Sequence, residues 1–530
     1  MTRRPVLLAI LLIGLGLRLF RLDSRPLGFT WDEAAIGYNA YSLLLTGRDE
    51  YGKLLPLVFK SFGDYKPGLY IYLAVPAVRL FDLTESATRL PSVILGTVAV
   101  ALVYVLARQL LGTKPAVWAA SLLAISPWAV HFSRAAWESN VSLTVTLLAV
   151  TLFLRRRYLL SALFFGLTLW AYQGAKMFTP LLIISLLWFS RTPLRLSALI
   201  RPAVILLAVI APIIAGVAFQ SGRLKVFSVF SYQRPPEAVA EILRQDSTPV
   251  KDLSFYLFHS ETLDQLRGIA QRYLNHLSPR FLFIDGDWSN PRQSTPFYGQ
   301  LHLPEFLTLL VGLYVLLRSN TPGSKILLSW LLLAPLPSAL SRDIISAVRS
   351  LPMVVPLTII SGLGLSYLTR RRLVVLAFMT LMGFFLVYFF DLYFIHSPHY
   401  TASGWLYPYK PALTLVADNL DKYSRVVISD RLGQPYIFTL FYLKVNPGMF
   451  QGRAQFVASP VGDVGAVTGF GKFEFRPIFW PADRGRTSTL FVGDIYELPE
   501  SDLENTPGLV RVGEIAPPDG YPGWRVVALP

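Results

Sequence analysis

Long apolar runs separated by short basic turns fill the chain up to about residue 390. A helix needs roughly 20 mostly apolar residues to cross a membrane, and most of these runs approach that length. The runs predict eleven membrane-spanning helices, over residues 5–22, 91–107, 115–131, 139–154, 158–174, 176–190, 202–219, 303–318, 325–340, 350–368 and 373–390. The predicted fold class is therefore an all-α polytopic membrane domain.

One further apolar segment, residues 68–81, is shorter than the others and contains Pro76. A segment of about 14 residues is too short to span a membrane. We therefore expect a helix that lies in or dips into the outer leaflet, inside one outer loop over residues 23–90. A second long outer loop is expected over residues 220–302.

The pattern changes after residue 390, where apolar runs become short and are separated by Gly and Pro. Residues 425–429, 489–492 and 525–529 read as strands. The sequence therefore predicts two domains, a transmembrane catalytic domain over residues 1–390 and a small soluble α/β, or mostly β, domain over residues 391–530.

Charge sets the predicted orientation. The chain carries a net charge of +16, yet residues 391–530 contain 12 Lys or Arg and 14 Asp or Glu, so the excess lies in the membrane domain. Basic clusters mark cytoplasmic loops, which places the N-terminus inside, and an odd number of spans places the C-terminal domain outside a plasma membrane. The first apolar run follows two arginines like a signal peptide, but no small-residue cleavage site follows it, so we expect a retained span.

Composition also narrows the function classes. With no soluble basic domain, the basic charge favours anionic lipid substrates over nucleic acid. The chain contains no Cys, which excludes disulfides, thiolate zinc sites and cysteine nucleophiles.

Two adjacent acids stand a few residues after the first predicted span. Asp32 and Glu33 open a helical pattern that runs to Leu45, and charges this close to a membrane are usually functional. Glu33 has an alternative role, because Thr30-x-x-Glu33 is a capping box. Asp32 is better placed for chemistry, since Trp31 and the membrane interface would partly desolvate it.

Other polar residues fall on the same predicted outer face. Lys66 suits a lipid phosphate, although ordinary snorkelling at the interface would also place a lysine there. Asp285-x-Asp287 would suit a divalent cation. Arg134 and Glu138 stand four residues apart and would be able to pair on one helical face. The remaining candidates on this face are Tyr65, Arg89, Lys176 and Arg349.

Taken in chain order, these pieces resemble the membrane-embedded GT-C glycosyltransferases. Within that class the likeness is to the protein O-mannosyltransferase and lipid A aminoarabinose-transferase group, which depends on a phospholipid carrier. The matching pieces are Trp31-Asp32-Glu33, Tyr65-Lys66-Pro67-Gly68, Glu85 to Pro91, Ser126-Pro127 to Arg134 with Glu138, Gly174-Ala175-Lys176 and Arg349 to Pro352. They cover about residues 1–370.

The resemblance implies that a polyprenyl-phosphate donor gives its sugar, with inversion, to a hydroxyl of a protein, lipid or envelope glycan at the outer face. By resemblance Asp32 is the base that activates the acceptor, Lys66 binds the donor phosphate and Glu138 is the second carboxylate. The predicted catalytic residues are Asp32, Glu33 and Glu138; the predicted phosphate ligands are Lys66, Arg134 and Arg349; further substrate contacts are expected from Tyr65, Arg89, Lys176, Asp285 and Asp287.

Two positions depart from the family pattern. Tyr65 precedes the lysine where the lipid A enzymes have an acid, and Glu138 replaces the more usual Asp. Two other function classes remain open. A lipid or sugar transporter or flippase tends to place charges near the membrane midplane and to show repeated halves, which this chain lacks. The third class is a non-catalytic scaffold for envelope assembly.

Overall fold

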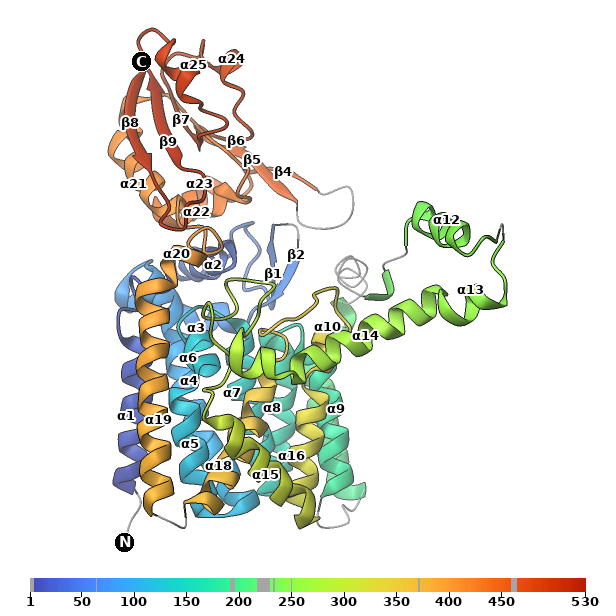
Figure 1. The fold of residues 1–530 in the computed structure, drawn as a ribbon. Coiled ribbons are helices and arrows are strands. Elements are labelled where there is room, and N and C mark those ends of the chain that lie inside the picture. Colours follow the sequence, from blue (N-terminus) through green and yellow to red (C-terminus); the bar gives the residue numbers. More distant parts are fainter. Residues whose placement is uncertain are drawn as a thin grey trace.

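The structure is a computed structural model, and it describes residues 4–62, 64–190, 196–216, 229–231, 234–248, 250–369, 372–458 and 465–530. Helices form a bundle along most of the chain, and a small sheet domain stands at one end of it (Figure 1). The predicted all-α membrane part and the predicted sheet-containing C-terminal part are therefore both present.

Each of the eleven predicted spans falls on helix over its described residues; the span predicted over 202–219 ends in residues 217–219, which lie outside the described ranges. The helices of the bundle are α1 (Arg4–Leu19), α4 (Glu85–Leu111), α5 (Thr113–Ile125), α6 (Pro127–Ser133), α7 (Glu138–Leu154), α8 (Tyr158–Ala171), α9 (Ala175–Phe189), α10 (Leu196–Gly216), α15 (Glu305–Ser319), α16 (Pro322–Leu333), α17 (Leu336–Ala339), α18 (Val354–Leu368) and α19 (Arg372–Asp391). Two spans are broken: α5 and α6 meet at a bend of 54°, and Pro335 separates α16 from α17.

By length and composition, four helices of the described chain are long and apolar enough to cross a membrane, or five if the bent pair α5–α6 counts as one. They are the helices over Glu85–Leu111, Ser197–Ala215, Leu351–Leu368 and Arg372–His396. The structure thus supports a multi-pass membrane protein, and the count of eleven spans stays a prediction.

Small residues allow close helix packing inside the bundle. A Cβ built on Gly312 of α15 would lie 1.9 Å from the carbonyl oxygen of Ile360 in α18. A Cβ on Gly364 of α18 would lie 1.8 Å from the carbonyl oxygen of Thr308. Glycine is required at both positions because the two backbones are in direct contact, as is common between membrane helices.

The predicted outer loop over residues 23–90 is structured at the end of the bundle nearest the sheet domain. It contains α2 (Trp31–Thr46), a hairpin of β1 (Val58–Ser61) and β2 (Asp64–Pro67), and α3 (Leu69–Phe81). The short segment predicted over residues 68–81 is indeed a helix, of 13 residues.

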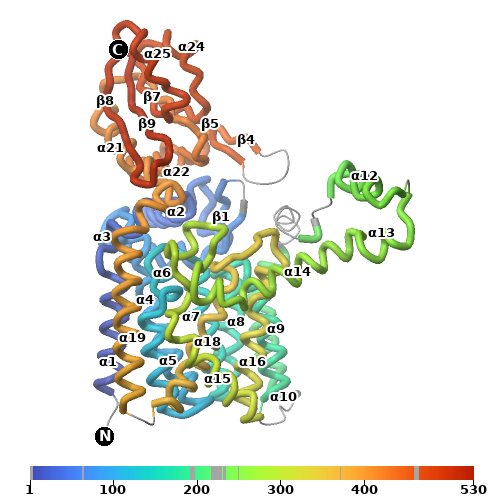
Figure 2. The backbone as a smooth tube through the Cα atoms, viewed as in Figure 1, coloured from blue at the N-terminus to red at the C-terminus, as the bar shows by residue number. Residues whose placement is uncertain are grey.

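The second predicted outer loop is also largely helical where it is described. It contains α12 (Pro236–Gln245), α13 (Leu253–Phe258) and α14 (Glu261–Leu277), which together extend sideways from the bundle (Figure 2).

The C-terminal domain is built on a seven-stranded mixed sheet of order β4-β5-β6-β3-β7-β9-β8. The strands are β3 (Arg425–Ile428), β4 (Gln455–Val457), β5 (Ala466–Phe470), β6 (Phe473–Phe475), β7 (Thr489–Asp494), β8 (Val510–Ile515) and β9 (Trp524–Leu529). The three strands expected from the sequence are β3, β7 and β9, which are neighbours in the sheet. Its helices are α20 (Pro398–Thr401), α21 (Tyr409–Asn419), α22 (Pro435–Tyr442), α23 (Pro447–Phe450), α24 (Trp480–Asp483) and α25 (Glu500–Glu504). The predicted α/β class is therefore observed.

Helix α22 joins this domain to the bundle. Its Phe441 ring lies 4.7 Å from the Phe29 ring, and a Cβ on Gly37 of α2 would lie 2.6 Å from Phe441. Tyr442 Oη donates a hydrogen bond to Glu85 Oε1 at 2.6 Å. The sheet domain is therefore packed directly on α2 and on the start of α4.

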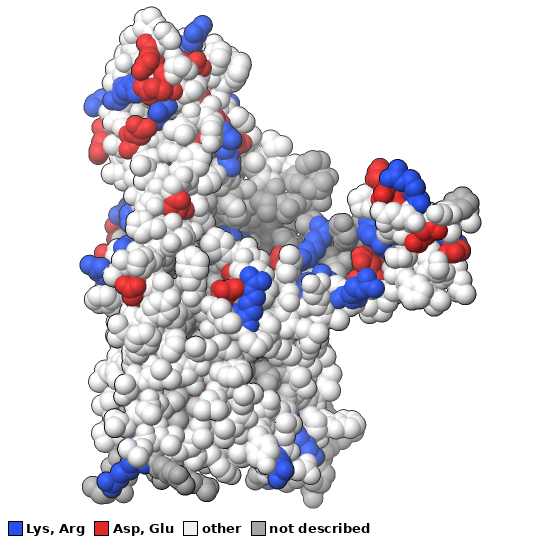
Figure 3. Space-filling view, viewed as in Figure 1, with Lys and Arg blue, Asp and Glu red and all other residues white. Residues whose placement is uncertain are grey.

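Charged side chains gather at the two ends of the bundle, and a broad band without them lies between (Figure 3). This distribution suits a protein whose middle third contacts lipid.

Candidate active site

The capping box predicted at the start of α2 is present. Thr30 Oγ1 accepts a hydrogen bond from the Glu33 backbone N at 3.3 Å, and the Thr30 backbone N donates to Glu33 Oε2 at 3.1 Å. This reciprocal pair fixes where α2 begins, and it therefore fixes the orientation of Asp32 on its first turn.

Glu33 is also the centre of a buried ion pair. Arg89 Nε of α4 donates to Glu33 Oε1 at 2.9 Å, and the Ala136 backbone N donates to the same oxygen at 2.9 Å. Both side chains are buried. The predicted candidates Glu33 and Arg89 thus contact each other and join α2, α4 and the turn before α7. Their geometry is that of a structural pair.

Asp32 and Lys66 form an ion pair across the gap between α2 and the β1–β2 hairpin. The two residues were predicted for different tasks, base and phosphate ligand, and the structure brings them together. The Asp32 side chain is 49% exposed and that of Lys66 only 9%. A solvent-accessible carboxylate therefore lies directly against a largely buried ammonium group.

An aromatic ring lies against Lys66 on the hairpin side. Its Nζ lies 4.7 Å from the centre of the Phe62 ring. The Phe62 ring packs at 6.0 Å, edge to face, against Tyr436 of α22. The C-terminal domain thus supports the hairpin that carries Lys66.

Glu50 is a buried carboxyl group near this lysine that the sequence analysis did not single out. Burial raises the pKa of Glu50 to about 8, and the neighbouring Asp49 adds to the rise. The charge of Lys66 and hydrogen bonds from Tyr436 and Asn39 act in the opposite direction. A hydrophilic loop segment, Arg48 to Tyr51, gives no sequence signal that one of its acids is enclosed.

Tyr65 and Lys176 lie on the other side of the hairpin. Gln173, in the turn between α8 and α9, donates from Nε2 to the Tyr65 backbone oxygen at 3.0 Å. Pro67, Gln173 and Lys176 line the same small crevice. These two predicted substrate contacts are therefore close to Lys66 along β2.

Arg292 is a cation near Asp32 that the sequence did not select as a site residue. Its guanidinium lies 5.9 Å from the centre of the Trp31 ring, next to Asp32. Its backbone oxygen accepts a hydrogen bond from His131 Nε2 at 2.7 Å, which holds this loop against α6. Across the described ranges, no carboxylate lies within ion-pair distance of Arg292.

Arg134 is placed differently from its predicted role as a phosphate ligand. It is fully buried, and its terminal nitrogens donate to backbone oxygens around the end of α1, including Leu17 at 2.6 Å and Phe20 at 2.7 Å. The guanidinium also lies 5.4 Å from the ring of Tyr393, just after the end of α19. Because backbone carbonyl groups accept hydrogen bonds from its guanidinium, Arg134 stabilises the end of α1 and is not proposed as a phosphate ligand.

Arg349, Asp285 and Asp287 likewise have protein partners. Arg349 pairs with Asp343, and Asp285 accepts from Arg280 Nε at 2.6 Å. Asp287 is buried, and its Oδ2 accepts from the Ala347 backbone N at 2.8 Å. The first two contacts lie within the segments 341–350 and 280–292, and the hydrogen bond from Ala347 to Asp287 joins the two segments.

The two aspartates of the predicted cation motif thus have separate partners. Within the residues that the structure describes, no group of three His, Cys, Asp or Glu side chains is arranged to hold a metal ion.

Glu138 begins α7, two residues after Ala136, whose backbone N contacts Glu33. The turn that carries this predicted second carboxylate therefore packs against the first turn of α2, beside Asp32. Of the eleven predicted site residues, Asp32 and Lys66 contact each other, and Glu33 and Arg89 form a second pair on the same turn of α2. Tyr65, Lys176 and Glu138 lie on segments that pack beside these two pairs.

Part of the chain matches the model of a known protein family. Residues 65–215 match the family model described as dolichyl-phosphate-mannose-protein mannosyltransferase. No curated protein sequence matches the chain.

Among solved structures, ArnT from Cupriavidus metallidurans bound to undecaprenyl phosphate is 14% identical, with a TM-score of 0.55 and 100% of both chains covered. The apo form of the same protein is 13% identical at a TM-score of 0.55 and 99% coverage of both chains. The archaeal oligosaccharyltransferase AglB from Archaeoglobus fulgidus is 14% identical with a TM-score of 0.47; the match covers 83% of this chain and 63% of that enzyme's length.

At these identities the solved structures show only a shared fold. The family model matches residues 65–215, which include Lys66 of the hairpin and the turn between α8 and α9. The recognition made from the sequence is therefore confirmed: the chain resembles the GT-C glycosyltransferases of the protein O-mannosyltransferase and ArnT-like group.

Proposed function

We propose that this protein transfers a sugar from a polyprenyl-phosphate donor to an acceptor hydroxyl at the end of the bundle next to the C-terminal domain. The observation that carries the proposal is the ion pair between Asp32 and Lys66. It joins an accessible carboxylate, suited to take a proton, to a cation suited to a phosphate. The ArnT structure of the same fold contains undecaprenyl phosphate, which supports the choice of donor class.

The proposed step exchanges one ion pair for another. The donor phosphate takes Lys66 as its counter-ion, and Asp32 is released to accept a hydrogen bond from the acceptor hydroxyl. The hydroxyl oxygen then attacks the anomeric carbon while its proton moves to Asp32. The bond from that carbon to the phosphate oxygen breaks, its electron pair stays on the phosphate, and the configuration at the carbon inverts.

The chemistry requires no nucleotide. A polyprenyl phosphate is a good leaving group once its charge is neutralised, and preorganised cations do this best in a water-poor site. Lys66 is largely buried, and Arg292 beside Trp31 offers a second positive charge. Tyr65, Lys176 and Glu138 lie on segments that pack beside these residues and are assigned to sugar or acceptor contacts. The class of acceptor stays open among protein, lipid and envelope glycan.

The transporter alternative is less well supported. Transporters place ionisable groups near the middle of the membrane, whereas Asp32 and Lys66 lie at one end of the bundle under the sheet domain. The family model that matches residues 65–215 is also described as a mannosyltransferase.

Sugar transfer by purified protein tests the proposal. The donor is a synthetic polyprenyl-phosphate sugar, and the readouts are released polyprenyl phosphate and glycosylated acceptor in membrane extracts. Asp32→Asn should lower turnover by about 10² to 10⁴-fold, the usual effect of removing a general base. Asp23→Asn is the matched control, because Asp23 is an exposed aspartate that precedes α2. Equal turnover in the two variants would exclude Asp32 as the base and favour transport.

A further inference from the structure

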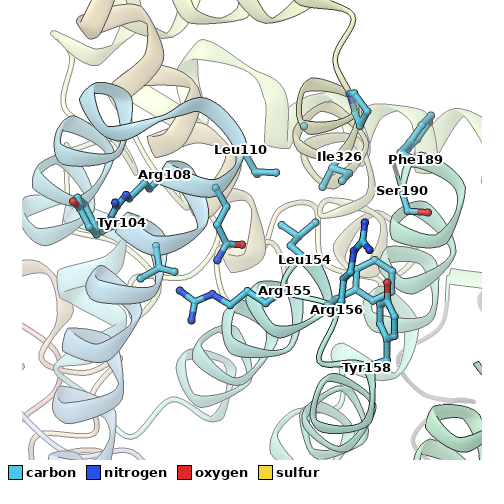
Figure 4. A pocket seen from close by; sticks show the side chains of 15 residues that line it. Tyr104, Arg108, Leu110, Leu154, Arg155, Arg156, Tyr158, Phe189, Ser190 and Ile326 are labelled. Carbon is cyan, nitrogen blue, oxygen red and sulfur yellow. The ribbon is translucent and has the colours of Figure 1, made fainter. Parts of the chain in front are cut away.

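A cavity of about 560 Å³ opens at the end of the bundle opposite to Asp32 and Lys66. It lies between the last turn of α4, the turn joining α7 to α8, the end of α9 and the start of α16 (Figure 4). Small-molecule sites in proteins commonly have volumes of about 300–1,000 Å³, so this cavity is large enough for a ligand.

Three arginines from two segments line this cavity. Arg108 comes from the last turn of α4, and Arg155 and Arg156 come from the turn after α7. Figure 4 shows Arg155 extending toward α4 and Arg156 toward the end of α9. Among the residues that the structure describes, none of the three has a carboxylate within ion-pair distance or a side-chain hydrogen bond.

The surroundings offer no negative charge to neutralise them. Between Glu85 and Glu237 the sequence contains a single acid, Glu138, and residues 306–342 and 344–390 contain none. Glu138 begins α7 at the other end of that helix, 16 positions before Leu154. The face seen in Figure 3 shows basic but no acidic side chains at this end of the bundle.

The rest of the cavity wall combines polar and apolar side chains, which suits an amphiphilic ligand. Tyr104 and Tyr158 bring hydroxyl groups, while the other contacts are mainly apolar, among them Leu110, Leu154 and Phe189. Positive loops on the cytoplasmic side of membrane proteins are common. That rule accounts for basic residues along the rim, but it does not require three of them to surround one cavity without a partner.

We propose that this cavity binds the phosphate of an anionic headgroup, with Arg108, Arg155 and Arg156 as its ligands. Basic pockets between membrane helices on this side bind phosphate-rich lipid headgroups. The apolar part of the wall would receive the glycerol backbone and the first acyl carbons of a lipid. This site lies far along the bundle from the proposed transfer site, and it does not depend on that function.

The test compares two triple variants with the same change in charge. The pocket variant is Arg108→Gln, Arg155→Gln and Arg156→Gln. The control is Lys114→Gln, Arg157→Gln and Arg318→Gln, at the same end of the bundle but outside the cavity wall. Each protein is reconstituted in nanodiscs of phosphatidylglycerol and phosphatidylcholine in equal parts, and retained lipids are counted by native mass spectrometry.

The parent and the control should retain phosphatidylglycerol in preference to phosphatidylcholine, and the pocket variant should lose that preference. Each basic residue near a membrane surface strengthens anionic lipid binding about fivefold, so affinity for short-chain phosphatidylglycerol should fall on the order of 100-fold. Equal retention by the two triple variants, or no preference in the parent, would overturn the proposal.

A second arm separates the two sources of the phosphate. Thermal melting in detergent is followed while inorganic phosphate or dihexanoyl phosphatidylglycerol is added. A shift with phosphate alone that depends on the three arginines assigns a soluble ligand, and a shift only with the lipid assigns a headgroup. If the pocket triple variant elutes as an aggregate, the single variants Arg155→Gln and Arg156→Gln are used, and each should weaken binding about fivefold.

Discussion

Tyr436 in the C-terminal domain donates a hydrogen bond from Oη to Oε1 of the buried Glu50, at 3.4 Å. Glu50 belongs to the segment between α2 and the hairpin that carries Lys66, and its own backbone N donates to Asn39 of α2. The ring of Tyr436 also stacks on Phe450 at 5.8 Å. One tyrosine thus connects the sheet domain to the buried acid beside the proposed site.

Glu50 should make the stability of the protein depend on pH. Its pKa in the folded protein is raised to about 8 from a usual value of 4.5. Between these values the folded state holds a proton that the unfolded state has lost, so stability falls as pH rises from about 4.5 to about 8. Melting temperature measured in detergent from pH 5 to 8.5 should decrease over this range.

The Glu50→Gln variant distinguishes the contribution of Glu50 to this pH dependence from the contributions of other titratable groups. Gln keeps the size and the hydrogen-bonding ability of the protonated acid, so the variant should melt higher than the parent at pH 8 and equally at pH 5. Glu504→Gln, at an exposed residue of α25, should follow the parent at every pH. A parent and Glu50→Gln that melt in parallel across the range would contradict the prediction.

Breaking the buried ion pair of Glu33 and Arg89 should lower the stability of the folded protein. Arg89→Met leaves the Glu33 carboxylate buried without its cation, and breaking such a pair typically costs about 3–5 kcal/mol. The yield of monodisperse protein and its melting temperature should fall sharply. The double variant Arg89→Met with Glu33→Gln should recover part of the loss, because the uncompensated charge is removed. A double variant no more stable than Arg89→Met would show that the loss of stability comes from packing and not from the unpaired charge.

The bundle could be predicted from the sequence because each run of apolar residues is long and ends at a basic turn. All eleven predicted spans therefore fall on helix over their described residues. The bend of 54° between α5 and α6 was missed, although Ser126-Pro127 is a visible signal: Ser126 caps the next helix and proline suits its first position. Three of the seven strands of the C-terminal domain, β3, β7 and β9, could be predicted from their β-branched and apolar residues. The other four strands and the order of the sheet could not, since register depends on contacts distant in sequence.

The site was predicted only in part, for a related reason. Asp32 and Lys66 stand out as charges beside a membrane, yet their mutual contact depends on how the hairpin folds over α2. Arg134 also stands out as a charge, but its partners are backbone carbonyls at the end of α1, which no side-chain pattern reveals. Arg292, one of many polar residues in the loop 278–305, was not chosen as a site residue, and Glu50 was not considered, because burial and neighbours, not residue type, distinguish them.

Arg292 should contribute to donor binding if it provides the second positive charge. Arg292→Gln should raise the KM for the polyprenyl-phosphate sugar about tenfold with little change in kcat, while Arg292→Lys should restore part of the affinity because it keeps the charge. Arg280→Gln is the control, because Arg280 precedes the same loop and is engaged with Asp285. A fall in kcat at unchanged KM would show that Arg292 acts in the chemical step and not in donor binding.

The orientation of the chain in the membrane can be tested by cysteine labelling, because the sequence contains no Cys. We expect the C-terminal domain and Asp32 outside the cell and the Arg155–Arg157 turn inside, since basic turns stay in the cytoplasm. Single cysteines are introduced at two exposed uncharged residues, Tyr496 after β7 and Gln109 in the last turn of α4. Neither change alters the charge that sets the topology. A maleimide that cannot cross membranes should label Tyr496→Cys on intact cells and should label Gln109→Cys only after the cells are opened. The reverse pattern would place the proposed transfer site in the cytoplasm, and the donor would then have to be presented on the inner leaflet.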